Sequence, residues 1–261
     1  MKTAIITGAS RGIGRATALL LAAHGFDIAF NHLGDGARAD DTAAAIAALG
    51  RRVIHAEADM ADPIAIRAFA SHAQAALGPP DVLVNNAGMN IRGPFETYAE
   101  ADFDQVMAVH VKGMFVMAQA VYPAMLARGA GRIINVASQL AFKGQEELVA
   151  YCMAKAAIIG FTRALAREAA PRGVLVNAVA PGPVTTELTA ARGLEWSAAM
   201  AAALPVRRMG TPEDIAATIL PGWRLLCRGL PVAQWRGCHA LRTPRYRRCR
   251  PRPPTAGEPT S

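Results

Sequence analysis

Tyr151 and Lys155 stand four residues apart in a stretch whose pattern predicts a helix, so both side chains fall on one helix face. A phenol, with a pKa near ~10, exchanges protons poorly at neutral pH. A neighbouring ammonium stabilises the phenolate and lowers that pKa, so the pair suits general acid/base chemistry on an alcohol or carbonyl oxygen. Ser138 follows a predicted strand and could hold the same oxygen. The pattern alone also allows an exposed tyrosine beside a surface lysine.

A glycine-rich stretch, Thr7-Gly8-Ala9-Ser10-Arg11-Gly12-Ile13-Gly14, lies between the first predicted strand and the first predicted helix. Its glycines permit a tight turn and a close approach of the backbone to a pyrophosphate. The N-terminus of the following helix offers free N–H groups and a positive dipole end to the same anion. The spacing differs from the usual G-x-G-x-x-G, so an ordinary glycine-rich turn is the alternative.

Two features of the sequence bear on the choice of dinucleotide. An acid at the tip of the second strand would bind a ribose 2′-hydroxyl and favour NAD, but that tip carries Asn31 and His32, and Asp35 comes a few residues late. Arg11, with no acid nearby, favours the 2′-phosphate of NADP. We therefore expect NADP(H) to be preferred, with NAD(H) and a merely solvated Arg11 as the alternatives.

The elements that must position these residues alternate along the chain. Strands are predicted over 2–7, 26–31, 53–57, 82–85, 132–137 and 174–180, and helices over 13–23, 38–49, 64–77, 99–128 and 151–169, with a further helix starting at Thr211. Apolar strands alternating with helices predict an α/β fold: a Rossmann-type doubly wound parallel sheet in three α/β/α layers. Ligands of such sheets bind beyond the carboxyl ends of the strands, where every motif falls.

Charge divides the chain into two parts. Residues 1–220 hold 19 basic and 19 acidic residues, whereas residues 221–261 hold nine arginines and one acid, which account for the whole net charge of +8. We expect a dinucleotide-binding and catalytic domain over 1–220 and an atypical Arg- and Pro-rich tail over 221–261. Clustered arginines can bind phosphates nonspecifically. The neutral body and the lack of a recognisable module argue against a specific nucleic-acid partner.

The remaining composition indicates a cytoplasmic protein without a membrane partner. The apolar run at the N-terminus is too short for a signal peptide, and no apolar stretch approaches the ~20 residues of a membrane span. Cys152 is the one cysteine of the body, which suits a reducing compartment. The tail cysteines lack metal-ligand spacing, and we expect no metal site.

Together the motifs identify a resemblance that covers residues 1–220. The matching pieces are Thr7-Gly8-x-x-x-Gly12-x-Gly14, Asp59, Asn85-Asn86-Ala87-Gly88, Ser138, Tyr151-x-x-x-Lys155 and Pro181-Gly182-x-Val184-x-Thr186. In order and spacing they resemble the short-chain dehydrogenase/reductase family, and within it most the bacterial 3-oxoacyl-acyl-carrier-protein reductases.

The resemblance implies an oxidoreductase that transfers a hydride between NADP(H) and a carbonyl/alcohol pair, reducing a 3-oxoacyl or related ketone, as in fatty acid synthesis. It implies that Tyr151 protonates the developing alkoxide, that Ser138 orients the carbonyl, and that Lys155 binds the nicotinamide ribose and depresses the Tyr151 pKa. It implies a small-molecule carbonyl substrate, carried on acyl-carrier protein, and a homo-oligomer (dimer or tetramer) if the C-terminus permits. A cofactor-binding sensor or scaffold with little or no catalysis is the alternative.

The cofactor-binding residues follow from the same resemblance. They are Gly8, Ser10, Arg11, Gly12, Ile13, Gly14, Asn31, Asp59, Met60, Asn86, Ala87, Gly88, Tyr151, Lys155, Pro181, Gly182, Val184 and Thr186.

The sequence departs from the family at two places. His110 replaces an asparagine whose main-chain carbonyl supports a water in the proton relay to the lysine. Histidine retains that carbonyl, so we count His110 among the catalytic residues as part of a reduced but working relay, with a new acid/base as the alternative. After Leu220 the family's closing strand and turn are missing. We hypothesise a reading-frame shift near Leu220, which the coding DNA would decide, and expect an exposed apolar sheet edge.

Overall fold

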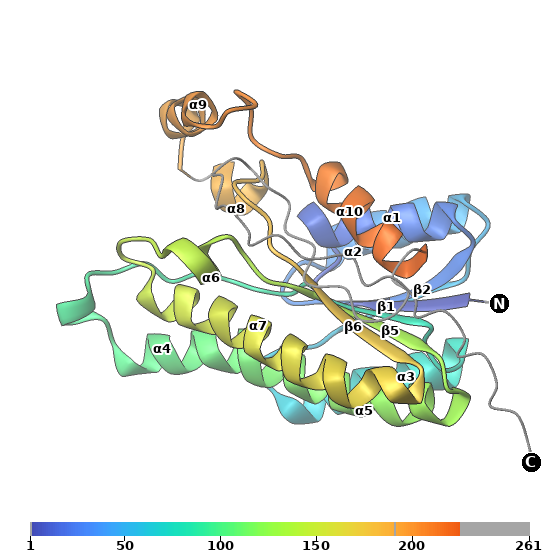
Figure 1. The fold of residues 1–261 in the computed structure, drawn as a ribbon. Helices are drawn as coiled ribbons and strands as arrows, with labels where there is room; N and C mark the ends of the chain where they lie inside the picture. The colour runs from blue at the N-terminus through green and yellow to red at the C-terminus, as the bar shows by residue number, and fades with distance from the viewer. Residues whose placement is uncertain (1, 191, 225–261) are drawn as a thin grey trace, which may run out of the picture.

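The computed structural model of the chain describes residues 2–190 and 192–224, which are arranged in three layers (Figure 1). Six strands form one parallel sheet in the order β3-β2-β1-β4-β5-β6. Their bounds are β1 Lys2–Ile6, β2 Phe26–His32, β3 Val53–Glu57, β4 Val82–Asn85, β5 Gly131–Val136 and β6 Val174–Val179. This order reverses direction between β1 and β4, as in the doubly wound dinucleotide-binding sheets, and confirms the predicted fold class.

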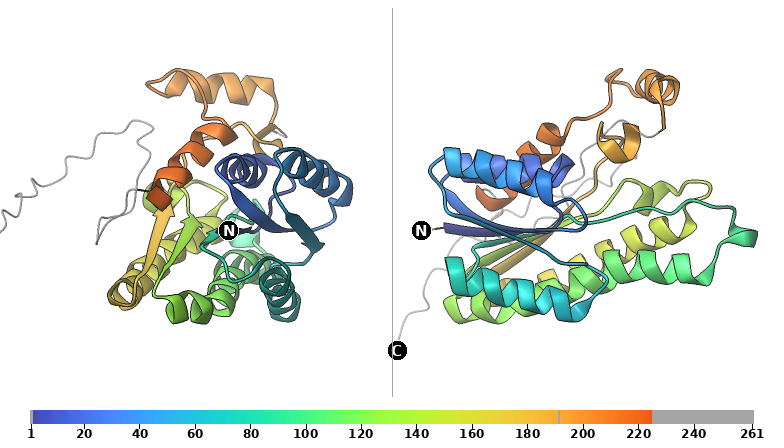
Figure 2. Two further views of the ribbon diagram at one scale, coloured as in Figure 1. Left: turned by 90° about the vertical axis from the view of Figure 1, so that its right-hand side faces the viewer. Right: turned by 180° about the vertical axis from the view of Figure 1, so that it is seen from behind.

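Helices cover both faces of the sheet, as Figures 1 and 2 show. One face carries α1 (Gly12–Ala23), α2 (Gly36–Ala48) and α10 (Pro212–Arg224); the other carries α3 (Pro63–Leu77), α5 (Met114–Arg128) and α7 (Val149–Ala169), with α4 (Glu100–Met107) ahead of α5. The short elements are η1 (Phe95–Thr97), η2 (Ala108–Gly113), α6 (Leu140–Lys143), η3 (Ala170–Arg172), α8 (Glu187–Ala190) and α9 (Leu194–Ala203). Figure 1 places α8 and α9 at the same end of the molecule as α6.

The strands are apolar because both of their faces are covered. Along β1, Ile5 packs with the α3/α5 side of the core, while its neighbour Ile6 packs with the α1/α10 side. Leu83 and Val84 divide in the same way in β4. This two-residue alternation gives every central strand two buried faces, and hence the near-continuous hydrophobic runs of a parallel sheet.

A buried polar chain fixes α7 on the sheet. Asn135 in β5 accepts a hydrogen bond at Oδ1 from Asn85 Nδ2 (2.8 Å) and donates from Nδ2 to Thr162 Oγ1 (2.9 Å). Thr162 Oγ1 donates in turn to the Ile158 carbonyl (2.7 Å). Buried, directional bonds of this kind specify one register of the helix.

By length and composition the segment Val149–Arg172 could cross a membrane, but in this structure it packs against the sheet.

The structure corrects the predicted elements at two points. The single helix expected over 99–128 is interrupted by a π-helical turn, η2, at Ala108–Gly113. Gly113 is needed there, because a Cβ on it would lie 2.2 Å from the Met60 carbonyl oxygen. The helix expected from Tyr151 begins earlier, at Val149.

The last helix of the described residues, α10, begins as its sequence predicts. Thr211 accepts from Asp214 N at Oγ1 (3.2 Å), and Asp214 Oδ2 accepts from Thr211 N (2.9 Å), a reciprocal cap. The helix α10 continues to Arg224. Most of the atypical tail, from residue 225 on, lies outside the described residues, so the boundary at residue 220 and the frame shift remain predictions. Within the described residues the sheet ends at β6.

Candidate active site

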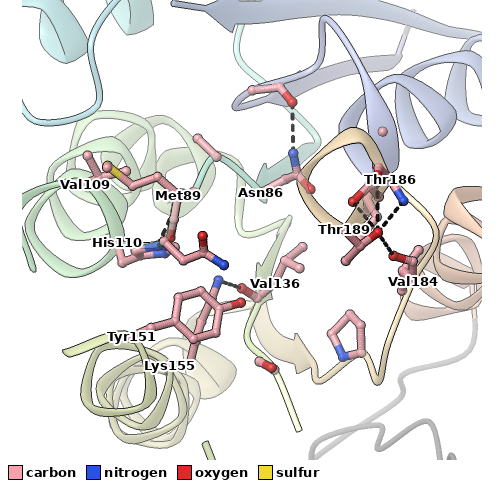
Figure 3. A pocket seen from close by; sticks show the side chains of 18 of the residues that line it. Asn86, Met89, Val109, His110, Val136, Tyr151, Lys155, Val184, Thr186 and Thr189 are labelled. Carbon is pink, nitrogen blue, oxygen red and sulfur yellow. Dashed lines mark hydrogen bonds between the residues drawn. The ribbon is translucent and has the colours of Figure 1, made fainter. Parts of the chain in front are cut away.

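A cleft of about 1200 Å³ opens beyond the carboxyl ends of the strands. All predicted site residues except Gly14 line it, although they come from eight separate segments of the chain. Figure 3 shows Tyr151 and Lys155 side by side on one helix, His110 beside them, and Val184 and Thr186 across the cleft. The structure thus brings the predicted catalytic and cofactor-binding residues together in one place.

The glycine-rich loop forms one wall of this cleft. Gly8 (φ +67°) and Gly12 (φ +55°) both adopt left-handed backbone conformations. Gly14 lies behind the loop, where a Cβ would be 2.2 Å from the Gly8 carbonyl oxygen, so it lets α1 approach the loop. Among the described residues no side chain caps α1, and its first turn holds no acid. The free N–H groups and positive dipole end of this helix therefore suit a phosphate group.

Two asparagines hold the glycine-rich loop in place. Asn31 accepts at Oδ1 from Gly8 N (3.1 Å) and donates from Nδ2 to the Ala58 carbonyl (2.8 Å). Asn86 donates from Nδ2 to the Gly8 carbonyl (2.9 Å). Thr7, which we did not predict as a site residue, accepts from the Asn86 and Ala87 nitrogens at Oγ1 (2.9 and 3.0 Å).

The expectation that no acid lies near Arg11 is wrong. Asp35 folds back onto the loop, where its Oδ2 accepts from Ser10 Oγ (3.1 Å) and lies 3.9 Å from Arg11 Nε. Arg38 Nε lies 3.7 Å from the other oxygen of Asp35. The positive φ of Gly34 (+63°) begins the turn that returns Asp35 to the cleft, a bend that strand and helix periodicity could not predict. Two guanidinium groups thus flank one carboxylate at this end of the cleft.

The other predicted cofactor contacts are held by short turns. Asp59 Oδ1 accepts from Ala61 N (2.8 Å), and Met60 is buried beside it. Across the cleft, the Pro181 carbonyl accepts from Gln139 N (2.9 Å), and the Val184 carbonyl accepts from Thr189 Oγ1 (2.8 Å). In the part of the chain that the structure describes, no cluster of three or more His, Cys, Asp or Glu side chains could hold a metal ion.

Lys155 is almost fully buried, and its Nζ donates to the Val136 carbonyl at the end of β5 (2.8 Å). Burial without a carboxylate partner lowers the pKa of Lys155 to about 7. The amine is therefore poised to hold or release a proton near neutral pH.

Tyr151 differs from the sequence-based expectation. Burial raises the pKa of Tyr151 to about 12, although its hydrogen bond with Ser138 acts in the opposite direction. The Lys155 amine lies 5.5 Å from the centre of the tyrosine ring. In this state the phenol keeps its proton at neutral pH.

His110 occupies the π-helical turn, and its ring meets that of Tyr151 edge-on, with centroids 5.4 Å apart. Nε2 lies 2.6 Å from the Met89 carbonyl oxygen and 3.1 Å from the Met89 nitrogen, and the shorter contact requires that Nε2 carry the proton and donate. Nδ1 is buried and has no hydrogen-bond partner among the described residues. Burial, and secondarily the Lys155 charge, lowers the pKa of His110 to about 3. A neutral imidazole favours the relay over the acid/base alternative.

Gly88 completes the packing around His110. A Cβ at Gly88 would lie 2.4 Å from His110 Cε1. The glycine of Asn-Asn-Ala-Gly is thus needed for the imidazole as well as for the cleft that it lines.

Comparisons with known proteins agree with this geometry. A family model described as short chain dehydrogenase matches residues 2–195. A 3-oxoacyl-acyl-carrier-protein reductase of Staphylococcus aureus strain Mu50 is 38% identical over 218 residues, 84% of this chain and 89% of that protein.

Among the solved structures similar to this chain are complexes with NADPH and NADP. A blue fluorescent protein from a metagenomic library, in complex with NADPH, is 38% identical with a TM-score of 0.82, covering 89% of this chain and 96% of that one. A short chain dehydrogenase from Burkholderia cenocepacia J2315, in complex with NADP, is 38% identical with a TM-score of 0.77, covering 84% and 88%.

The buried lysine predicts a pH-dependent stability. Below pH about 7 the folded and unfolded chains both hold the Lys155 proton; between about 7 and the ordinary 10.5 only the unfolded chain does. The unfolded state then binds more protons, so the free energy of unfolding of the cofactor-free protein should rise with pH in this window relative to Lys155→Met. Urea unfolding at several pH values measures this difference. Lys112→Met, at an exposed lysine, is the control, and parallel curves for the parent and Lys155→Met would contradict the assignment.

The contacts of His110 predict the effect of restoring asparagine. An asparagine amide retains a donor for the Met89 carbonyl, and the main-chain carbonyl of residue 110 is unchanged, so His110→Asn should maintain or raise kcat. His110→Phe, which lacks the donor, should lower it. Steady-state rates test both variants, and a collapse of His110→Asn would refute the relay interpretation.

Proposed function

The chain belongs to the short chain dehydrogenase family, and from that premise we propose that it transfers a hydride between NADP(H) and a carbonyl/alcohol pair, reducing a 3-oxoacyl or related ketone. The observation that carries the proposal is one continuous cleft, with an uncapped helix N-terminus at one part and Ser138, Tyr151 and Lys155 at another. A dinucleotide has the length and the charges to connect these parts.

The residues of the cleft fit NADP(H). The first turn of α1 and the glycine-rich loop would hold the pyrophosphate, and Arg11, which lines the cleft, would face a 2′-phosphate, with Arg38 held nearby through Asp35. Lys155 would hold the nicotinamide ribose, and Val184 and Thr186 the carboxamide. When bound, the nicotinamide supplies or accepts the hydride, and the protein supplies orientation and electrostatics. The solved relatives in complex with NADPH and NADP support this choice over NAD(H).

Protein groups would manage the proton. Ser138 would donate to the substrate carbonyl and hold it against the Tyr151 hydroxyl, which would protonate the developing alkoxide. A bound substrate changes the environment of the phenol, and the Lys155 ammonium then favours its deprotonation. His110 would support the water that returns a proton to Lys155.

We call the part of the cleft that is lined by Met89, Leu140, Leu148, Trp196 and Met200 the substrate half. Its apolar surface suits an acyl chain. Arg92, Lys143 and Arg192 line the same cleft. This combination supports an acyl group joined to a carrier protein, like the 3-oxoacyl-acyl-carrier-protein named for the Staphylococcus aureus relative, and hence a cytoplasmic role in fatty acid synthesis. The face of α5 with the half-exposed Phe115 would serve a homo-oligomer.

The test of function is oxidation of NADPH and NADH against β-ketoesters, acyl thioesters and simple ketones. We expect turnover with NADPH and a 3-oxoacyl thioester. Tyr151→Phe should abolish turnover, because the proton donor is lost, while NADPH fluorescence titration shows unchanged binding. Turnover by Tyr151→Phe would overturn the mechanism. An inactive parent that still binds NADPH would favour the sensor or scaffold alternative.

The salt bridges at Asp35 predict how cofactor preference changes. Arg11→Gln removes a cation from the 2′-phosphate and should lower kcat/KM with NADPH about tenfold or more, since a bond between charged groups contributes roughly 1.5–3 kcal/mol. It should leave NADH nearly unaffected. Asp35→Asn removes the competing carboxylate and should raise the NADPH/NADH ratio. Equal effects of Arg11→Gln on both cofactors would contradict a 2′-phosphate site here.

A further inference from the structure

The loop that follows β4 forms one wall of the substrate half and is fixed at three points. Met89 is held by His110, as described above. The Ile91 carbonyl accepts from the Tyr98 hydroxyl (3.1 Å). The third point is Glu147, which bonds two consecutive residues: its carboxylate accepts from Arg92 Nη2 (3.1 Å), and its main-chain carbonyl accepts from Gly93 N (3.1 Å).

Glu147 makes these bonds from an unfavourable backbone conformation. Its φ is +60°, and among the described non-glycine residues only Arg207 shares a positive φ. A side chain in the left-handed region is held there only when its surroundings determine it, and such residues cluster at functional sites. The Arg92–Glu147 side chains are 30% and 52% exposed, and pairs so exposed contribute little to stability. Stability alone therefore does not account for the arrangement.

The position of Glu147 along the chain gives it a second role. It stands two residues before α7 begins and four before Tyr151. Leu148, between them, is buried, and its carbonyl accepts from Cys152 N in the first turn of α7 (2.8 Å). Arg92 lines the cleft, whereas Glu147 does not. Glu147 therefore reaches a bound substrate only through Arg92 and through the start of the helix that carries Tyr151.

We infer that Arg92 and Glu147 form a clamp that sets the position of the substrate wall relative to Tyr151. In this pair Arg92 is the residue that faces the substrate, and Glu147 is a positioning residue. The inference rests on the proposed function for its kinetic readout, because substrate binding is what the clamp improves.

Substitutions at Glu147 separate the parts of the clamp. Glu147→Gln keeps an acceptor for Arg92, Glu147→Ala removes it, and Glu147→Gly removes it while relieving the backbone conformation. We expect KM for the ketone substrate to rise about tenfold in Glu147→Ala and Glu147→Gly, because the substrate wall is then no longer held in position against Tyr151. Glu147→Gln should recover most of that loss. The dissociation constant for NADPH should stay unchanged in all three.

The matched control is Glu146, an exposed glutamate with no hydrogen bond or ion pair among the described residues. Glu146→Ala should leave KM unchanged. Glu146→Gly should lower the melting temperature, because it loosens an ordinary backbone position, whereas Glu147→Gly should melt higher than Glu147→Ala. A positioning role is supported if KM rises in Glu147→Ala and Glu147→Gly while Glu147→Gly has the higher melting temperature of the two. Equal KM in the parent and Glu147→Ala overturns the clamp.

Hydrogen exchange tests the clamp without any turnover. In Glu147→Ala the amides of Gly93 and Cys152 should both exchange faster than in the parent, while the amide of Ile134 in β5 should not change. If the parent binds NADPH but reduces no ketone, the proposed function fails and this readout still decides the clamp. Unchanged exchange at both Gly93 and Cys152 overturns it.

Discussion

The burial of one amine organises this site. Lys155 is enclosed by protein, and its described hydrogen bond goes to a main-chain carbonyl at the end of a strand, so it can stay there only if α7 keeps its register on the sheet. The Asn85–Asn135–Thr162 chain maintains that register about two turns further along the helix. Tyr151 is placed by the same helix, one turn before Lys155. The chemistry of the cleft thus depends on a helix–sheet contact made away from it.

Periodicity and motif position predicted much of this molecule. Short apolar runs alternating with helical patterns predicted six strands. These runs are apolar because each central strand is buried on both faces. The carboxyl ends of parallel strands meet at one edge, so the glycine-rich loop, Asn86, Ser138 and Pro181 were expected together and lie in one cleft. The left-handed glycines, Gly8 and Gly12, follow from the same requirement for a tight turn.

What could not be predicted depends on contacts between distant segments. The return of Asp35 to Arg11 depends on a turn at Gly34, and the π-helical turn depends on the approach of Gly113 to Met60. Asn31 lines the cleft, where its contact with the cofactor stays a prediction, and its bonds to Gly8 and Ala58 give it a second role in shaping the loop that the sequence did not indicate. No sequence signal marked Glu147, because a glutamate gives no indication of a positive φ.

The contact between Gly88 and His110 constrains the route by which such a site can evolve. An alanine at residue 88 would place its methyl carbon inside the space of the imidazole, so the two side chains exclude each other. In a chain with histidine at residue 110, alanine at residue 88 is therefore excluded, whereas a smaller residue at 110 would permit it. The order in which changes arise at these two positions then matters, a case of epistasis with a steric origin.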